Sequence, residues 1–173
     1  VQNFYTFLSS VDIENLEIFQ KGWIYIQDES TALPVLLLNP QAGETILDLC
    51  AAPGGKTTLM AEKMRNKGKI VALDKDLNKL KLIQENCQRL GVEIVEIKLG
   101  DGNNFVCEPV DKILVDAPYS ALGVLERNAE ARWLKQEKDL KRLSQLQLAL
   151  LNNAKKLVKK EGTIVYSTCT LAK

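Results

Sequence analysis

Short apolar runs alternate with longer amphipathic stretches along most of the chain. Runs of this length, bounded by turn residues, are typical of buried β-strands. Five of them are expected to form strands, at Thr45–Leu49, Lys69–Leu73, Ile94–Ile97, Lys112–Val115 and Thr163–Ser167. Strands that alternate with helices predict an α/β fold, in which a mostly parallel sheet carries helices on both faces.

Apolar residues at helical spacing fill the intervals between these runs. They predict helices over residues 30–38, 56–67, 77–90 and 134–159. Trp23–Gln27 has the alternation of one further short strand. We therefore expect a lead-in segment over residues 1–40, with this strand and the first helix, and a core domain over residues 41–173.

Composition narrows the classes of function. The 173 residues suit one domain, and 46% apolar with 26% charged residues is ordinary for a globular protein. With 23 Lys and Arg against 22 Asp and Glu, the net charge of +1 leaves only local basic patches for binding nucleic acid. No apolar run reaches the ~18 residues of a membrane span. The four cysteines form no Cys-x-x-Cys pair and histidine is absent, so we expect no metal site and a reducing, cytoplasmic location.

Small residues crowd the turn after the first core strand. The turn consists of Cys50, Ala51, Ala52, Pro53, Gly54, Gly55 and Lys56. Small side chains let a ligand approach the backbone closely, and the start of the following helix favours an anionic group. The turn matches neither a Walker A loop nor G-x-G-x-x-G. An ordinary tight turn between strand and helix is the alternative.

Acidic residues follow the next two strands. Asp74 ends the second strand at the spacing from the glycines, about 20 residues, where a carboxylate accepts hydrogen bonds from ribose hydroxyls. Asp101 follows the third strand and is suited to accept from the exocyclic amine of adenine. A helix cap for Asp74 and an Asx turn for Asp101 are the alternatives. Together with the turn, both carboxylates predict a nucleoside cofactor across the strand ends.

Four segments, in order over residues 22–170, resemble the motifs of one enzyme family. The segment ILDLCAAPGGKT at Ile46–Thr57 resembles the cofactor motif of the Sun/Fmu family of RNA (cytosine-5) methyltransferases. The other three resemble the family's Gly…Gln-Asp segment, its active-site motif and its nucleophile motif, and lie at Gly22–Ser30, Asp116–Asn128 with Arg132-Trp133, and Tyr166–Thr170. The members most similar to this chain act on bacterial small-subunit ribosomal RNA.

The resemblance implies a Rossmann-like class I methyltransferase domain that uses S-adenosylmethionine and acts on RNA. The cofactor would lie on the turn from Cys50 to Lys56, with Asp74 at the ribose, Asp101 near adenine and Asp116 also in the cofactor site. Cys169 matches the nucleophile, which attacks carbon 6 of cytosine so that carbon 5 becomes able to take the methyl group. Asp116 would contact the edge of the base and stabilise the intermediate. From the residues alone, a small buried side chain at a strand end is the favoured interpretation of Cys169, and the resemblance reverses that preference.

The sequence departs from the family at two places. Tyr119 stands where the family has a second cysteine, which assists loss of the carbon-5 proton and release of the product. A phenol with a pKa near ~10 is a poor substitute for a thiolate, so we hypothesise impaired release and a lasting covalent adduct with RNA. Sheets of this class also continue with two more strands after the fifth, and we expect those strands to be lacking here.

Other interpretations stay open at this point. Tyr119 and the missing strands are compatible with a non-catalytic remnant that binds S-adenosylmethionine or RNA. A nicotinamide-dependent dehydrogenase is disfavoured by the lack of G-x-G-x-x-G, and a small-molecule methyltransferase only by the resemblance. Arg127, Arg132 and Trp133 form a basic and aromatic cluster that suits RNA contact and surface packing about equally.

Overall fold

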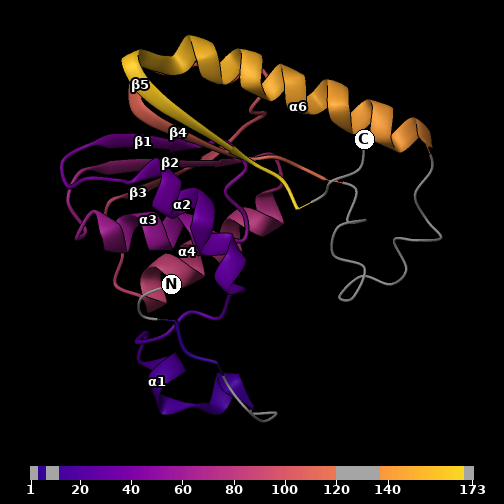
Figure 1. Ribbon diagram of the computed structural model, residues 1–173. Helices are drawn as coiled ribbons and strands as arrows, with labels where there is room; N and C mark the ends of the chain where they lie inside the picture. Colours follow the sequence, from indigo (N-terminus) through magenta and orange to yellow (C-terminus); the bar gives the residue numbers. More distant parts are fainter. Residues whose placement is uncertain (1–3, 7–11, 120–136, 170–173) are drawn as a thin grey trace.

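The computed structural model describes residues 4–6, 12–119 and 137–169. Figure 1 shows a layered α/β domain with a short helical segment, near the N-terminus, that stands apart from the sheet. In chain order the elements are η1 (Ile13–Asn15), α1 (Glu17–Gln20), η2 (Glu29–Ala32), α2 (Leu33–Leu38), β1 (Thr45–Asp48), α3 (Gly55–Lys63), β2 (Lys69–Asp74), α4 (Leu77–Arg89), β3 (Val95–Leu99), β4 (Val110–Asp116), α6 (Glu137–Leu157) and β5 (Val158–Ser167).

The five strands form one sheet in the order β3-β2-β1-β4-β5, and every neighbouring pair is parallel. Chain order reverses at β1, since β2 and β3 lie on one side of it and β4 and β5 on the other. Ligands of such sheets bind outside the carboxyl ends of the strands, beside the point of reversal. The predicted parallel sheet is confirmed, and it places the ends of β1 and β4 next to one another.

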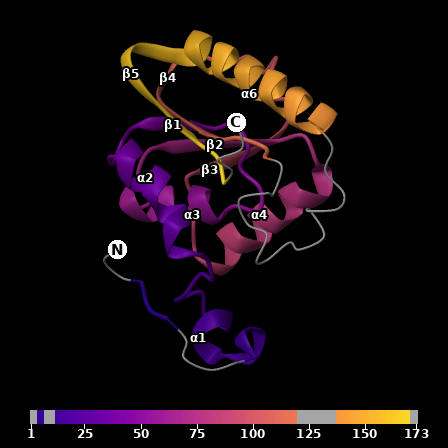
Figure 2. The same cartoon turned by 45° about the vertical axis from the view of Figure 1, so that its right-hand side comes forward.

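Helices cover both faces of the sheet, as predicted (Figures 1 and 2). On one face Ile46, Ile70 and Leu114 pack against α2 and α3, and Ala72 packs against α4. On the other face Leu47, Val71 and Ile113 belong to a core cluster that α6 closes with Leu150, Ala154 and Leu157. Because successive side chains of a strand point to opposite faces, each central strand contributes to both clusters. The strand ends are therefore held by packing from two sides.

The strand predicted at Trp23–Gln27 is wrong. Residues 24–28 have no regular secondary structure and cross the start of α3, and no strand of the described ranges pairs with them. The carbonyl of Ile24 accepts a hydrogen bond from the Arg89 side chain instead, at 2.9 Å. The helix predicted next is confirmed in part, as a 3-10 turn followed by α2.

The fifth strand begins earlier than predicted, at Val158 rather than Thr163. Its pairing with β4 shifts register between Val110 and Lys112, and Glu161 has a φ of +68° within the irregular part. An ion pair of 2.7 Å between Lys159 and Asp111 spans this region. The charged residues from 159 to 161 hide the beginning of the strand from a search for apolar runs.

No helix in the described ranges is long and apolar enough to cross a membrane.

Candidate active site

A cleft opens at the carboxyl ends of β1 and β4, where the topology places it. Its walls come from the turn after β1, from the start of α3, from the end of β4 and from the lead-in segment. The lining residues are Tyr25, Ile26, Gln27, Asp28, Thr31, Asp48, Cys50, Ala51, Ala52, Pro53, Gly55, Lys56 and Asp116. Six of the seven turn residues predicted to bind a cofactor line this cleft, and Gly54 lies between two of them.

The turn after β1 is fixed by its own backbone. The Leu49 and Ala51 N–H groups extend the sheet, donating to the carbonyls of Leu114 in β4 and Leu73 in β2, each at 3.0 Å. Gly54 then has a φ of +105°, a left-handed conformation that strongly favours glycine, and its N–H donates to the Ala51 carbonyl at 2.8 Å. The peptide between Ala52 and Pro53 is cis. The chain thus makes a tight turn between β1 and α3, and the residues of this turn line the cleft.

Gly55 marks where the lead-in segment touches the turn. A Cβ at this position would lie 2.8 Å from Cε1 of Tyr25 and 3.2 Å from Oε1 of Gln27. No ordinary side chain fits between the start of α3 and these two residues. The lead-in segment therefore forms the wall of the cleft that faces α3.

Asp48 lies buried at the base of the cleft and was missed by the sequence analysis. Only 1% of the residue is exposed, and its Oδ2 accepts a hydrogen bond of 2.8 Å from the Thr57 hydroxyl. Its Oδ1 is buried and has no hydrogen-bond partner among the described residues. Burial raises the pKa of this carboxyl to about 7, and the neighbouring charge of Asp116 adds to the rise. The sequence did offer a signal for this residue, because Asp48 is a carboxyl group within the apolar run Ile46–Leu49.

Asp116 joins the ends of three elements. Lys56 Nζ, in the first turn of α3, lies 2.6 Å from Asp116 Oδ2, and both side chains are largely buried. The Ser167 hydroxyl, at the end of β5, donates to Asp116 Oδ1 at 2.6 Å. The Ala117 N–H donates to the Ser167 carbonyl at 2.9 Å, which fixes the ends of β4 and β5 to one another. Asp116 therefore has donors on both carboxylate oxygens.

The predicted catalytic residues follow these two strand ends. Tyr119 comes three residues after Asp116 and Cys169 two residues after Ser167, and both side chains are half-buried. The Oγ1 of Thr168, directly before Cys169, is buried and has no hydrogen-bond partner in the described part of the chain. The topology thus brings Asp116, Tyr119 and Cys169 to the same edge of the sheet, and their catalytic roles stay predictions. Arg127, Arg132 and Trp133 lie outside the described residues.

The two acidic residues predicted for a nucleoside lie at the carboxyl ends of neighbouring strands, Asp74 as the last residue of β2 and Asp101 two residues after β3. Asp74 Oδ2 accepts from the Ala52 N–H at 3.4 Å and Oδ1 from the Asp76 N–H at 3.0 Å, so Asp74 joins the end of β2 to the turn. Asp101 is exposed and accepts from the Asn103 N–H at 3.0 Å, which is the Asx turn weighed as its alternative. Within the described residues, the side chains form no group suited to hold a metal ion.

Known proteins match this chain over most of its length. The family model described as 16S rRNA methyltransferase RsmB/F matches residues 35–173. The probable ribosomal RNA small subunit methyltransferase B of Bacillus subtilis is 45% identical over 163 residues, which cover 92% of this chain and 36% of that protein. Ribosomal RNA small subunit methyltransferase B of an Enterobacter species is 41% identical, with 94% and 39% covered. The crystal structure of NSun6 from Pyrococcus horikoshii with SFG has a TM-score of 0.86 at 38% identity, with 95% and 42% covered.

These matches bear on the fold and on the extent of the chain. The Rossmann-like methyltransferase fold is confirmed, since a TM-score of 0.86 accompanies coverage of 95% of the chain. The chain spans between 36% and 39% of the length of the two curated relatives. The family model covers about four fifths of the residues, including the turn after β1, Asp116 and Cys169. The chain belongs to the RsmB/F family of 16S rRNA methyltransferases, the Sun/Fmu family that its four motifs resemble.

Proposed function

We propose that this chain is the catalytic core of an S-adenosylmethionine-dependent enzyme that methylates carbon 5 of cytosine in small-subunit ribosomal RNA. The observation that carries the proposal is the arrangement at the end of β4. There Asp116 is held by Lys56 from the cofactor turn and by Ser167 from the strand that leads to Cys169. One carboxylate thus connects the predicted cofactor site to the predicted nucleophile. The cytoplasmic location stays a prediction.

The cleft suits S-adenosylmethionine in three respects. Gly55 and Lys56, at the start of α3, line the cleft, and the N-terminus of a helix favours a carboxylate group. The unpartnered Oδ1 of Asp48 offers a buried acceptor to a donor such as an ammonium group. Asp74 ends β2 where ribose hydroxyls are expected, and NSun6 of the same fold was crystallised with SFG, an analogue of S-adenosylmethionine. When bound, the cofactor supplies an electrophilic methyl group.

Cys169 is proposed to make carbon 5 reactive. An aromatic carbon 5 is a weak nucleophile, and addition of the Cys169 thiolate to carbon 6 forms an S–C bond while the electron pair of the 5,6 double bond moves toward carbon 5. After methylation, the proton on carbon 5 leaves to a base and the S–C bond breaks, which restores the double bond and the thiolate. With no histidine in the chain, a carboxylate or the substrate itself must accept the thiol proton.

Tyr119 determines the fate of the adduct in this proposal. The family has a cysteine at the corresponding position, and that residue assists the last step. A half-buried tyrosine offers a weaker acid and a larger side chain at the end of β4. We therefore propose that methyl transfer proceeds but that release of the product is slow.

A denaturing gel with labelled small-subunit ribosomal RNA tests the proposal. Incubation with S-adenosylmethionine is expected to give an RNA–protein adduct that survives denaturation. Cys169→Ser should form none, whereas Cys107→Ser, which alters a partly buried packing cysteine, should retain it. Tyr119→Cys should lower the retained adduct and raise the yield of methylated RNA.

Three results would overturn parts of this proposal. An adduct formed by the Cys169→Ser variant would assign the nucleophile elsewhere. Rapid turnover by the unaltered chain, with no retained adduct, would refute the release defect. Binding of S-adenosylmethionine without methyl transfer to any RNA would favour the non-catalytic remnant, which Tyr119 also suggests.

A further inference from the structure

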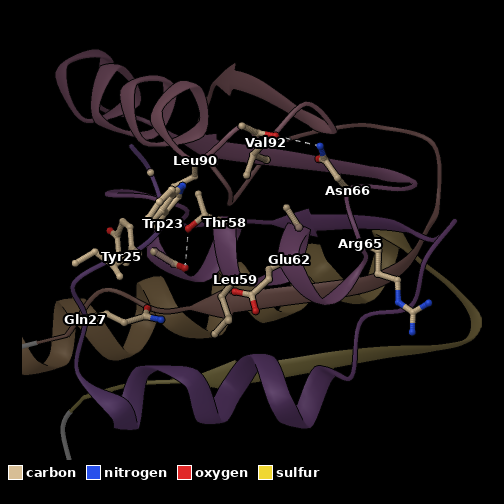
Figure 3. Close-up of a pocket in the computed structure, with 15 residues that line it drawn as sticks. Trp23, Tyr25, Gln27, Thr58, Leu59, Glu62, Arg65, Asn66, Leu90 and Val92 are labelled. Carbon is tan, nitrogen blue, oxygen red and sulfur yellow. Dashed lines mark hydrogen bonds between the residues drawn. The ribbon is translucent and has the colours of Figure 1, made fainter. Parts of the chain in front are cut away.

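The wall of the cofactor cleft formed by the lead-in segment has a second cavity behind it. Figure 3 shows this cavity, of about 370 Å³, with Trp23 and Tyr25 at one end and Leu90 beside them. Tyr25, Gln27 and Gly55 line both the cavity and the cofactor cleft. The wall is therefore a thin segment between two hollows. Packing from behind does not fix its position, so other contacts must.

Arg89, the last residue of α4, provides such a contact. Its Nη1 donates to the carbonyls of Phe19 and Ile24, each at 2.9 Å. Its guanidinium also lies 3.9 Å over the centre of the Phe19 ring. One planar side chain thus bridges two carbonyls five residues apart, which fixes the shape of the intervening turn.

The same turn lies directly on the end of α4. A Cβ at Gly22 would lie 1.8 Å from the carbonyl oxygen of Arg89, so the two backbones are in close contact. Tyr25 follows the second bridged carbonyl by one residue. The positive charge of Arg89 acts on its phenol, partly offsetting the rise in the Tyr25 pKa that burial causes. The turn, Arg89 and the wall are therefore neighbours in space.

The other end of the wall is held separately. The Asp28 carboxylate accepts from the N–H and the hydroxyl of Ser30, at 2.9 and 2.6 Å, and so begins η2. The Thr31 hydroxyl donates to the Gln27 side chain at 3.2 Å. Between Ile24 and Asp28 the backbone has no regular secondary structure. The positions of Tyr25 and Gln27 therefore depend on these two fixed ends, of which Arg89 holds the first.

We propose that Arg89 is a positioning residue for cofactor binding, which it influences by fixing the lead-in wall against Gly55. The inference rests on the proposed function, since it takes the cleft in front of the wall to be the S-adenosylmethionine site. Arg89 itself does not line that cleft. Its effect on affinity is indirect and runs through Tyr25 and Gln27.

Calorimetric titration of S-adenosylmethionine into four proteins tests the inference. Arg89→Met removes both bridging hydrogen bonds, and we expect about tenfold weaker binding. Arg89→Lys keeps the charge and the ability to donate but lacks the planar guanidinium, so its affinity should fall between those of Arg89→Met and the unaltered chain. Asn66→Ala is the matched control. Asn66 also makes two hydrogen bonds to backbone, with Gly91 and Glu93, but neither goes to the lead-in segment. It should lower Tm while affinity stays within about twofold.

Two further measurements keep the inference decidable. Gly22→Ala displaces the same turn without altering the Arg89 side chain, so this variant should also weaken binding of S-adenosylmethionine. If Arg89→Met does not fold, Gly22→Ala takes its place in the test. Hydrogen exchange of residues 23–28, measured without cofactor, should accelerate in Arg89→Met and not in Asn66→Ala.

The outcomes separate the inference from the proposed function. Unaltered affinity in both Arg89→Met and Gly22→Ala would overturn the inference, as would equal weakening in the Asn66→Ala control. Failure of the unaltered chain to bind S-adenosylmethionine would refute the cofactor site instead. In that case the exchange rates of residues 23–28 still decide whether Arg89 fixes the wall.

Discussion

Asp48 predicts an unusual dependence of stability on pH. The residue is 1% exposed, and burial raises its pKa to about 7. Asp48→Asn is the informative change, because an amide has nearly the same size and can still accept from the Thr57 hydroxyl but cannot ionise. The variant therefore removes the titration and preserves most of the packing.

The sign and the size follow from the two pKa values. The unfolded chain loses the Asp48 proton near the ordinary value of 3.8, and the folded chain near 7. A raised folded pKa means that this contribution to stability is complete below the unfolded value and is lost as pH rises through the folded value. Between pH 5 and pH 7 the free energy of unfolding should fall by roughly 1 kcal/mol per pH unit, about 2 kcal/mol in all.

Urea unfolding of the unaltered chain and of Asp48→Asn at pH 5, 6, 7 and 8 gives the free energy of unfolding of each. The difference between the two free energies at each pH measures the contribution of Asp48 titration. Stability of the unaltered chain should fall relative to Asp48→Asn up to pH 7 and level off by pH 8. Asp111→Asn serves as control, because the Lys159 ion pair and the Thr45 N–H lower the Asp111 pKa, and stability from a lowered pKa changes only below the ordinary value. Parallel curves for the unaltered chain and Asp48→Asn from pH 5 to pH 8 would show that the buried carboxyl is ionised throughout, and would refute the reasoning.

Three further predictions concern the cleft and the core. Gly55→Ala places a methyl group 2.8 Å from the Tyr25 ring, so affinity for S-adenosylmethionine in calorimetry should fall about tenfold; an unchanged affinity would show that the wall moves freely. Asp74→Asn should weaken the same binding more than Asp101→Asn, since Asp74 contacts the turn and Asp101 is exposed; the reverse order would contradict the assignment. Ile113→Ala, at a fully buried position, should cost about 3 kcal/mol in urea unfolding, and a cost below ~1 kcal/mol would mean that the core closes the gap.

The sequence was sufficient to predict the sheet and the turn after β1. The side chains of Ile46 and Leu47 are both fully buried, on opposite faces of the sheet. When helices alternate with such apolar runs, a central strand of a parallel sheet is almost the only structure that buries both faces. The turn was predictable because small residues and glycines gather after the strand, and Gly54 can adopt the left-handed conformation that the turn needs, which is a local property of the residue.

The remaining features depend on contacts between distant residues. The alternation at Trp23–Gln27 indicates that one side of the segment is covered, but not that the cover is the helix beginning at Gly55 rather than a strand. The burial of Asp48 likewise requires Thr57 and the neighbouring strands to be in place. The spacing of apolar residues indicates which positions are buried, but not which element covers them. Both features depend on tertiary packing, which can override the local preference of a segment.

The position of β1 in the sheet has a consequence for biosynthesis. β1 pairs with β2, which follows it closely, and with β4, which is reached only after α3, β2, α4 and β3. On the ribosome, the half of the sheet formed by β1, β2 and β3 can assemble while the rest is still being translated, because its contacts are closer in sequence. The Asp116 side of the cleft is added later, and Ser167 later still. Until β4 docks, the nascent chain leaves the backbone N–H and C=O groups along one edge of β1 unpaired, and this interval is when a chaperone would be needed most.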